Sequence, residues 1–412
     1  MTTTKNNEHK KLNFSSEREQ SQVCLNSAEH EKNQGRKVLN VPNLRFPEFQ
    51  GEWKKCKLEE LSNKITRKNK GNAIQNVLSN SATLGLIPQN EYFDREIANS
   101  NNTDSYYVIE YGDFVYNPRK SVSAPYGPVN IYTGNIKGII SPLYLCFSVH
   151  SILPSFLYYR FKSPAWFPYV YSHGDTGTRF DRVSIKDDVF FGMPIYMPSQ
   201  KEQKKISHLM SLLDKRIATQ NKIIDKLQSL IKGIAQHCIR DFTNGCEYVR
   251  LGDICKITTG KLDANAQVEN GQYPFFTCAE RPFNIDNYAF DTEALLISGN
   301  GANLGYINYY KGKFNAYQRT YVLDYFSVNI QYVKWALKVL LPQRIAIEKS
   351  SSNTPYIVLS TLADLKIPIP NNSKQNHIAD LMMSFERKLS TQLALSDLYN
   401  KQKQYLLRQM FI

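Results

Sequence analysis

The residues of this chain that could carry catalytic chemistry do not complete a motif. Gly299–Gly305 follows a predicted strand and resembles a dinucleotide-binding loop, but it has one residue too many before its third glycine, and a strand is predicted after it. Asn117-Pro118-Arg119 resembles the Asn-Pro-Pro-aromatic motif of adenine methyltransferases without its second proline and aromatic residue. No phosphate-binding, zinc-protease or serine-hydrolase motif occurs. We therefore expect a turn at each place and no catalytic residues.

The cysteines and histidines do not form the patterns expected of a metal site or a disulfide framework. The chain has seven cysteines, an odd number, and no Cys-x-x-Cys pair. His237, Cys238, Cys246 and Cys255 come closest to a metal cluster, but their spacing does not match that of a zinc finger or ribbon. We expect no metal site, and free thiols in a reducing compartment.

Composition indicates a folded, basic protein of two or three domains. The 412 residues are 42% hydrophobic, which excludes a wholly disordered chain, and the net charge of +14 favours a polyanionic partner. Residues 138–159 carry no charged side chain, but Pro142 and Pro154 interrupt them, so we predict a buried strand, a turn and a short helix there instead of a membrane span. Without a signal-like N-terminus, the protein is expected to be soluble and cytoplasmic.

The strongest feature is internal duplication, because three blocks occur twice in the same order. Residues 57–66 resemble 250–259, residues 177–180 resemble 353–356, and residues 195–198 resemble 367–370. The last pair of blocks leads into two helical patterns of about 40 residues that align at a shift of 172, so that Gln203 falls on Gln375. The duplication predicts two similar globules of mixed α/β (α+β) structure, each followed by a long helix.

Apolar residues recur in both helical patterns at alternating spacings of three and four, which is typical of a helix pair. Polar residues interrupt both patterns at matching positions, with Gln220 on Gln392 and Arg216 on Lys388. These residues either lie in a solvated part of the seam or pair with one another and fix the register. The first helix contributes Ile206, Leu209, Leu213, Ile223, Leu227, Leu230 and Ile234 to the predicted seam, and the second contributes Ile378, Leu381, Phe385, Leu395, Tyr399 and Leu406.

The expected domain organisation has five parts. A flexible polar tail covers 1–40, the first globule 41–198, the first long helix 199–240, the second globule 241–370 and the second long helix 371–412. Of the +14 charge, the helices carry +6 and +3, whereas the first globule carries +3 and the second is neutral.

These features together resemble the DNA-specificity subunit of bacterial type I restriction-modification systems. The resemblance covers residues 41–412 and rests mainly on the order and duplication of its motifs. The second helix departs from it, with Lys374 where the first has Glu202. The motifs are Asn43–Phe49 with Trp53, the helix entry from Ile195 to Ile206 with Pro198, Glu202 and Gln203, and Tyr273–Phe275, Phe290, Ala294–Ile297 and Lys313–Phe314 in the second globule.

The resemblance implies that each globule is a target-recognition domain that reads one half-site of a split, asymmetric sequence in double-stranded DNA. The long helices would pack as an antiparallel coiled coil with pseudo-two-fold symmetry, set the spacing of the half-sites, and dock two methyltransferase subunits. Restriction (translocase) subunits would complete the assembly. The chain itself would be non-catalytic and hold no cofactor, while its partners would use S-adenosylmethionine, ATP and Mg.

The side chains that could read DNA belong to the types that contact base edges and phosphates, on loops displayed by the sheets. Each could also be a solvated loop residue. The candidates are Arg119, Lys120, Thr178 and Arg179 in the first domain and Lys261, Asn303, Arg319, Ser352, Asn353 and Thr354 in the second.

Two other functions fit the same residues. The chain could be a free-standing sequence-specific DNA-binding regulator whose helix pair dimerises, or a scaffold protein that joins two partners without nucleic acid. The target sequence and spacer length cannot be read from the side chains, because recognition depends on loop geometry and DNA shape.

Overall fold

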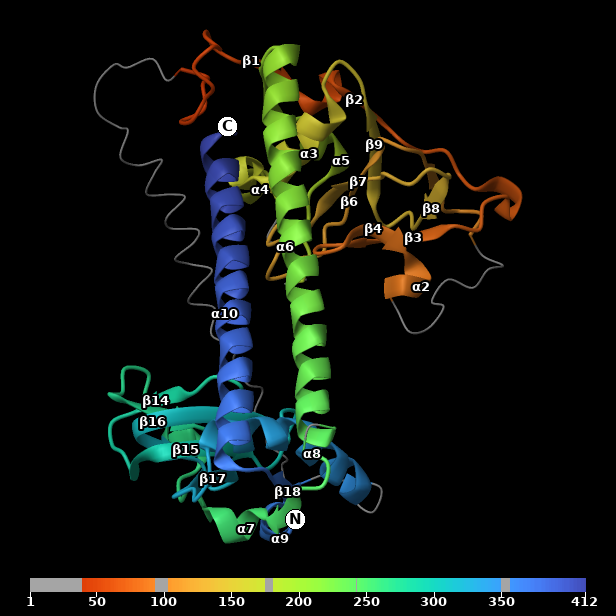
Figure 1. Ribbon diagram of the computed structural model, residues 1–412. Coiled ribbons are helices and arrows are strands. Elements are labelled where there is room, and N and C mark those ends of the chain that lie inside the picture. The colour runs from red at the N-terminus through yellow and green to blue at the C-terminus, as the bar shows by residue number, and fades with distance from the viewer. Residues whose placement is uncertain (1–38, 93–102, 175–180, 242, 350–355) are drawn as a thin grey trace, which may run out of the picture. The chain divides into compact units, whose positions relative to one another are not determined.

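The computed structural model describes residues 39–92, 103–174, 181–241, 243–349 and 356–412 (Figure 1). The chain divides into two compact units, Met1–Arg216 with Tyr399–Ile412, and Ile217–Leu398. The two long helices, α6 (Gln200–Arg240) and α10 (Asn372–Gln409), each contribute residues to both units. The helix α10 ends at Gln409, and Met410–Ile412 follow it in a non-helical conformation.

The first unit contains two four-stranded sheets and one two-stranded sheet. The four-stranded sheets have the orders β2-β9-β6-β7 and β4-β3-β8-β5, and β1 pairs with β10. Its strands are β1 (Lys54–Lys57), β2 (Ser62–Lys64), β3 (Val77–Ser81), β4 (Gly85–Pro88), β5 (Tyr107–Ile109), β6 (Phe114–Tyr116), β7 (Val129–Ile131), β8 (Gly138–Ile140), β9 (Leu145–Val149) and β10 (Pro194–Met197). Its shorter helices are η1 (Leu58–Glu60), η2 (Lys70–Asn72), α2 (Gln89–Tyr92), α3 (Pro154–Lys162), η3 (Pro164–Trp166), α4 (Phe167–His173) and α5 (Asp187–Phe191).

The second unit contains one six-stranded sheet and one two-stranded sheet. The large sheet has the order β12-β17-β15-β16-β13-β14, and β11 pairs with β18. Its strands are β11 (Glu247–Arg250), β12 (Lys256–Thr259), β13 (Tyr273–Phe276), β14 (Phe283–Ile285), β15 (Phe290–Ser298), β16 (Ile307–Ala316), β17 (Thr320–Asp324) and β18 (Lys366–Ile369). Its shorter helices are α7 (Leu251–Ile254), η4 (Ala264–Ala266), α8 (Ile330–Lys349) and α9 (Leu359–Ala363).

The prediction of duplicated mixed α/β globules is confirmed by strand pairing. The β3–β8 pair is parallel, as is its counterpart β13–β16, and the remaining pairs in both units are antiparallel. The two units differ because β5 and β6 together take the place of β15, and β7 and β8 that of β16. A turn separates β5 from β6, with Gly112 at φ +93° and the Asp113 carboxylate accepting from the Glu110 amide. One twisted sheet in the second unit is therefore two smaller sheets in the first.

One glutamine at the start of each long helix ties the helix to its globule. The Gln203 Nε2 amide donates to the Pro198 carbonyl (2.9 Å), and its Oε1 accepts from the Leu153 amide at the start of α3 (2.8 Å). Gln375 makes the equivalent bonds to the Pro370 carbonyl (2.8 Å) and the Asn329 amide at the start of α8 (3.0 Å). Both glutamines are buried, and helix-terminal amides without an intrahelical partner need such acceptors.

A second attachment lies three helical turns further along. Asp214 accepts a hydrogen bond from the Tyr159 hydroxyl of α3 (2.8 Å) and pairs with Lys403. Glu386, at the position equivalent to Asp214, pairs with Lys334 (2.7 Å) and Lys338 (3.0 Å) of α8. Each globule is thus fixed to a long helix at two points by residues that the duplication relates.

The two long helices run antiparallel where they pair. In the first unit the Arg216 guanidinium donates to the Tyr399 hydroxyl (3.0 Å), and in the second the Gln220 Nε2 amide donates to the Gln392 Oε1 (2.8 Å). Gln220 is buried, and its partner Gln392 is the residue that occupies the same position in the second repeat. Lys388, the equivalent of Arg216 in the repeat, is exposed.

The predicted seam is largely buried, with one error of phase. Ile223 and Leu230 are 44% and 52% exposed, and the adjacent Ile224 and Ile231 are buried instead. Leu395 is half-buried. The remaining predicted seam residues are buried or half-buried, namely Ile206, Leu209, Leu213, Leu227, Ile234, Ile378, Leu381, Phe385, Tyr399 and Leu406.

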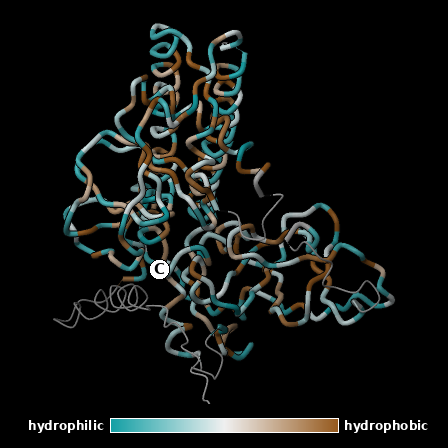
Figure 2. The backbone as a smooth tube through the Cα atoms, turned by 90° about the horizontal axis from the view of Figure 1, so that it is seen from below, coloured by the Kyte–Doolittle hydropathy of each residue, from teal (hydrophilic) through white to brown (hydrophobic). Residues whose placement is uncertain are grey.

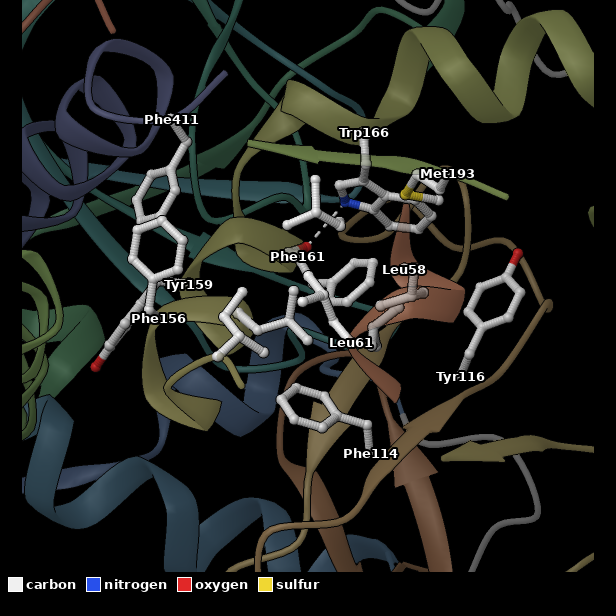
Figure 3. Packing of buried hydrophobic residues seen from close by; sticks show 14 of the residues in the cluster. Leu58, Leu61, Phe114, Tyr116, Phe156, Tyr159, Phe161, Trp166, Met193 and Phe411 are labelled. Atoms are coloured by element: carbon white, nitrogen blue, oxygen red, sulfur yellow. Dashed lines mark hydrogen bonds between the residues drawn. The ribbon is translucent and has the colours of Figure 1, made fainter. Parts of the chain in front are cut away.

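The main core of the first unit is aromatic (Figure 3). Phe161 and Trp166 pack edge to face at 5.6 Å, and the Trp166 indole donates to the Phe161 carbonyl (3.0 Å). Phe411, from the end of the chain, packs on Phe156 of α3. The core therefore includes the chain's last residues.

The opening motif of the fold meets the first long helix. Glu202, 1% exposed, accepts from the Arg45 guanidinium through both of its oxygens (2.7 and 2.8 Å) and from the Trp53 indole (3.3 Å). This hydrogen bonding raises the pKa of Arg45. The opening motif and the helix-entry motif, which are separate in the sequence, therefore contact each other in the fold.

Apolar and polar stretches alternate along the chain in both units, as Figure 2 shows. None of the described helices is long and apolar enough to cross a membrane. The uncharged segment 138–159 forms two strands, β8 and β9, and the start of α3, where one strand and one short helix were expected.

The Gln220–Gln392 contact can be tested by stability. Replacing Gln220 by leucine leaves the Gln392 side-chain oxygen without its donor, so the free energy of unfolding should fall by about 1–3 kcal/mol in a urea titration. The exposed Gln236 of the same helix is the matched control, and Gln236→Leu should change it by less than about 0.5 kcal/mol. Equal effects would show that the contact contributes nothing specific.

Candidate nucleic-acid interface

The first candidate surface is the loop 117–128, between β6 and β7. Its base is closed by the Asn117 amide, which donates to the Pro128 carbonyl (3.0 Å). The segment before α5 lies along it, since the Lys120 amide donates to the Asp181 carbonyl and the Val183 amide to the Pro118 carbonyl (2.8 Å each). The loop thereby displays its two predicted cationic residues at a fixed edge.

The Arg119 and Lys120 side chains at this edge are exposed, and Arg182 is half-buried. Arg119 forms a backbone bridge with Arg182, and its guanidinium lies 3.9 Å from the Asp181 carboxylate. The Arg119 side chain is 68% exposed, so this ion pair contributes little stability and leaves the guanidinium accessible. Arg119, Lys120 and Arg182 together form a small basic edge that can donate to phosphates or base edges.

A buried polar network supports the loop from beneath. The Lys162 ammonium donates to the Asn130 side chain (2.6 Å), whose amide donates to the Asn80 side chain (2.6 Å). The Asn80 carbonyl accepts from the Asn117 amide group (3.3 Å), and the Asn117 side-chain oxygen accepts from the Arg119 backbone (3.0 Å). Burial lowers the pKa of Lys162 to about 8. The position of Arg119 is therefore set by hydrogen bonds that extend from the interior.

The second candidate surface is the loop between β15 and β16. The Gly299 amide donates to the Arg319 carbonyl and the Gly305 amide to the Ser298 carbonyl (2.8 Å each). Gly301 and Gly305 have φ values of +80°, and the chain continues into β16, so the expected turn is confirmed and no dinucleotide-binding helix follows. The Asn303 side-chain amide is already engaged within the fold, because it donates to the Cys278 carbonyl (3.0 Å).

Arg319 lines a hollow of about 300 Å³ next to this loop. Gly299, Gln318, Tyr321 and Ile357 form the rest of its wall. The segment that carries Lys261 borders the same region, because Leu262 pairs with Tyr317 and its carbonyl accepts from the Gln318 amide (2.9 Å). Lys261, Asn303 and Arg319 therefore lie on segments that converge.

The two candidate surfaces occupy equivalent places in the duplicated fold. The Val183 amide donates to the Pro118 carbonyl after β6, and the Ile357 amide donates to the Gly299 carbonyl after β15 (2.9 Å). In both units the segment before a short helix thus joins the loop that follows a central strand. Thr178 and Arg179, and Ser352, Asn353 and Thr354, lie outside the described residues.

Sequence reasoning missed two residues that share these surfaces, Arg182 and Gln318. Arg182 pairs with the predicted Arg119, and Gln318 lines the hollow beside Arg319. Gln318 could have been inferred from its place next to Arg319, whereas Arg182 becomes a candidate only through its long-range pairing. Among the described residues, no three His, Cys, Asp or Glu side chains gather as a metal site. Six cysteines are described, and all are free.

The chain is similar to known proteins, in part of its length. Residues 244–395 match the family model of the Type I restriction modification DNA specificity domain. The chain is 43% identical over 146 residues to the type I restriction enzyme EcoDI specificity subunit of Escherichia coli, covering 35% of this chain and 31% of that protein. It is 23% identical over 260 residues to the MjaIX specificity subunit of Methanocaldococcus jannaschii, covering 53% of this chain and 59% of that protein. The chain thus spans less than two thirds of either relative.

The fold is shared over a longer stretch. The crystal structure of a type I restriction-modification S subunit from M. genitalium superposes with a TM-score of 0.58 at 15% identity, covering 90% of this chain and 99% of that one. A structure described as the basis of complex assembly and conformational transition of the type I R-M system gives 0.57 at 16% identity, covering 86% and 96%. The mixed α/β fold with long helices is therefore that of these structures.

Gly127 offers a test of the first loop. Its φ is +83°, and a Cβ there would lie 2.1 Å from the Asn117 carbonyl oxygen, so Gly127→Ala combines backbone strain with a clash at the loop base. Gly85 has a similar φ of +81° with open space around it, so Gly85→Ala measures the strain alone. We expect Gly85→Ala to cost about 1–2 kcal/mol of unfolding free energy and Gly127→Ala clearly more. Equal costs in urea titrations would contradict the packed loop base.

Proposed function

We propose that this chain, which resembles type I restriction-modification specificity subunits and carries the DNA specificity domain of that family in residues 244–395, selects the DNA sequence on which such a system acts. Each globule reads one half-site of a bipartite, asymmetric target in double-stranded DNA. The chain performs no chemistry itself and works in the cytoplasm. The chemistry is performed by two methyltransferase subunits, which use S-adenosylmethionine, and by restriction subunits, which use ATP and Mg.

The equivalent placement of the two candidate loops carries this proposal. The duplicated fold presents a loop after β6 and another after β15, each joined to the segment before a short helix. A protein with two related surfaces can place them on two half-sites of one duplex. The loops differ in length and residues, with Arg119 and Lys120 in one and Asn303 and Arg319 beside the other, so the two half-sites would differ in sequence.

The long helices serve as the spacer in this proposal. Hydrogen-bonded glutamines fix each globule to a helix, and the Gln220–Gln392 contact fixes the register of the pair. A fixed register gives a fixed separation of the half-sites, which a flexible linker would not. The helices also hold +9 of the net charge and provide the docking surface for the methyltransferase subunits.

Co-purification separates this proposal from its alternatives. The chain expressed in its own host should be recovered with an adenine methyltransferase. Sequence-specific DNA binding without such a partner would favour the free-standing regulator. Recovery with partners and no DNA binding would favour the scaffold.

Arg319 tests the reading surface of the second domain. If Arg319 contacts a base, Arg319→Ala should relax the second half-site at one position, at a cost of about 1–3 kcal/mol, and leave the first half-site unchanged. The measurement is methylome sequencing of cells that express the chain with its methyltransferase. Arg281→Ala, on an exposed loop of the same domain, is the control and should alter neither half-site. Uniform weakening of methylation at all sites would make Arg319 a phosphate contact.

Modularity gives a second test. Exchanging residues 48–198 for the corresponding domain of another specificity subunit should replace one half-site and leave the other intact, because the loop 117–128 lies within these residues and the loop between β15 and β16 lies outside them. The same methylome assay reports the result. A simultaneous change in both half-sites would contradict one domain per half-site.

A further inference from the structure

A basic groove of about 570 Å³ lies in the first unit, away from the residues considered so far. It is formed where the segment after β2 pairs with β5, next to the residue that precedes β8. Four of the residues that line it are cationic, namely Arg67, Lys68, Lys70 and Lys137. Thr66, Asn69, Ala73, Ile74 and Val108 complete the wall.

One buried side chain fixes the backbone that lines the groove. Asn69 is 2% exposed, and its side chain bonds the Ile74 backbone through both of its polar atoms (3.0 Å each). The Asn69 amide donates to the Tyr106 carbonyl (2.9 Å), and Lys68 pairs with Tyr107 at the edge of β5. The lysines on either side of Asn69 are exposed, so the chain fixes its backbone here and leaves the cations at the surface.

The charges of the groove are unbalanced. Glu110 pairs with both Arg67 (2.8 Å) and Lys137 (2.9 Å), and these contacts lower the pKa of Glu110, so its carboxylate is ionised at neutral pH. Within the described part of the chain, neither Lys68 nor Lys70 forms an ion pair. The nearby Asp104 carboxylate accepts from the Asn72 backbone amide (3.0 Å).

This imbalance accounts for the basic excess of its domain. Residues 41–198 contain 17 Lys and Arg against 14 Asp and Glu. Four of those cations line the groove, and one of those carboxylates, Glu110, pairs with two of them; outside these five residues the domain has as many acidic as basic residues. A domain that is otherwise neutral places its net positive charge at one rigid site, which is where a polyanion gains most from contact.

We propose that the groove of Arg67, Lys68, Lys70 and Lys137 binds the phosphate backbone of the DNA that the first domain reads. The cations are exposed and the groove is open, which suits a continuous chain of phosphates. The groove borders β5, whereas the loop 117–128 follows β6, so phosphate contacts here are separate from base contacts there. The proposal rests on the proposed function, and it supplies sequence-independent affinity to a domain whose reading loop is small.

Salt dependence tests the groove directly. The full chain is titrated with a fluorescent 30-base-pair duplex of arbitrary sequence over a series of KCl concentrations. The double variant Lys68→Gln, Lys70→Gln removes two cations, so the slope of log K against log salt should become shallower by about 1.8, at about 0.9 per phosphate. Lys54→Gln, Lys55→Gln removes the same charge from exposed lysines of β1 and should leave the slope unchanged.

A variant of opposite sign completes the test. Glu110→Gln removes the carboxylate that neutralises Arg67 and Lys137, so it should tighten DNA binding and steepen the slope. In the methylome assay all these variants should keep both half-sites unchanged, because phosphate contacts carry no base information.

The outcomes separate the two proposals. An unchanged slope in the Lys68, Lys70 variant, with both half-sites still read by the wild type, would overturn the groove alone. Loss of methyltransferase binding without a change in slope would also overturn it, by making the groove a protein contact. Equal loss in the Lys54, Lys55 control would show a general charge effect and overturn it. A shallower slope in the Lys68, Lys70 variant, combined with a wild type that directs no sequence-specific methylation, would retain the groove and overturn the proposed function.

Discussion

The fold depends on one glutamine at the entry of each long helix. A helix that is joined to a globule only through its backbone can adopt many orientations relative to that globule, because the backbone dihedral angles at the junction can rotate. Gln203 and Gln375 remove that freedom, since each side chain joins the carbonyl before its own helix to the first amide of a helix inside the globule. A side-chain amide supplies a donor and an acceptor on separate atoms, whereas an ionised Glu only accepts and a Lys ammonium only donates.

The second constraint is the reuse of one sheet topology with one break. Every strand pair of the first unit has a counterpart in the second, but the strand that is continuous as β15 is divided by the turn at Gly112 in the first. Beside this break, the segment that carries Lys68 pairs with Tyr107 of β5. Two units with the same pairing therefore display different surfaces, which is how a duplicated chain can address an asymmetric partner.

The net positive charge is distributed unevenly over the molecule. The helices carry most of the +14 charge, and the second globule is neutral, so overall basicity does not mark a reading surface. In the first globule the excess is located in the groove around Asn69. The loops with Arg119 and Arg319 are positioned by hydrogen bonds from the interior, which favours specificity over bulk attraction.

The sequence by itself determined the duplication, the two long helices and the paired glutamines, because repeats and helical periodicity are local signals. It misplaced Ile223 and Leu230, since each is followed directly by an isoleucine and a three-four spacing does not fix the phase between adjacent apolar residues. Only the tertiary structure decided that Arg45 meets Glu202, 157 residues away, that Arg182 joins Arg119, and that Lys137 joins the groove of Lys68. Such contacts join segments that lie far apart along the chain, and no spacing of residue types along the chain encodes them.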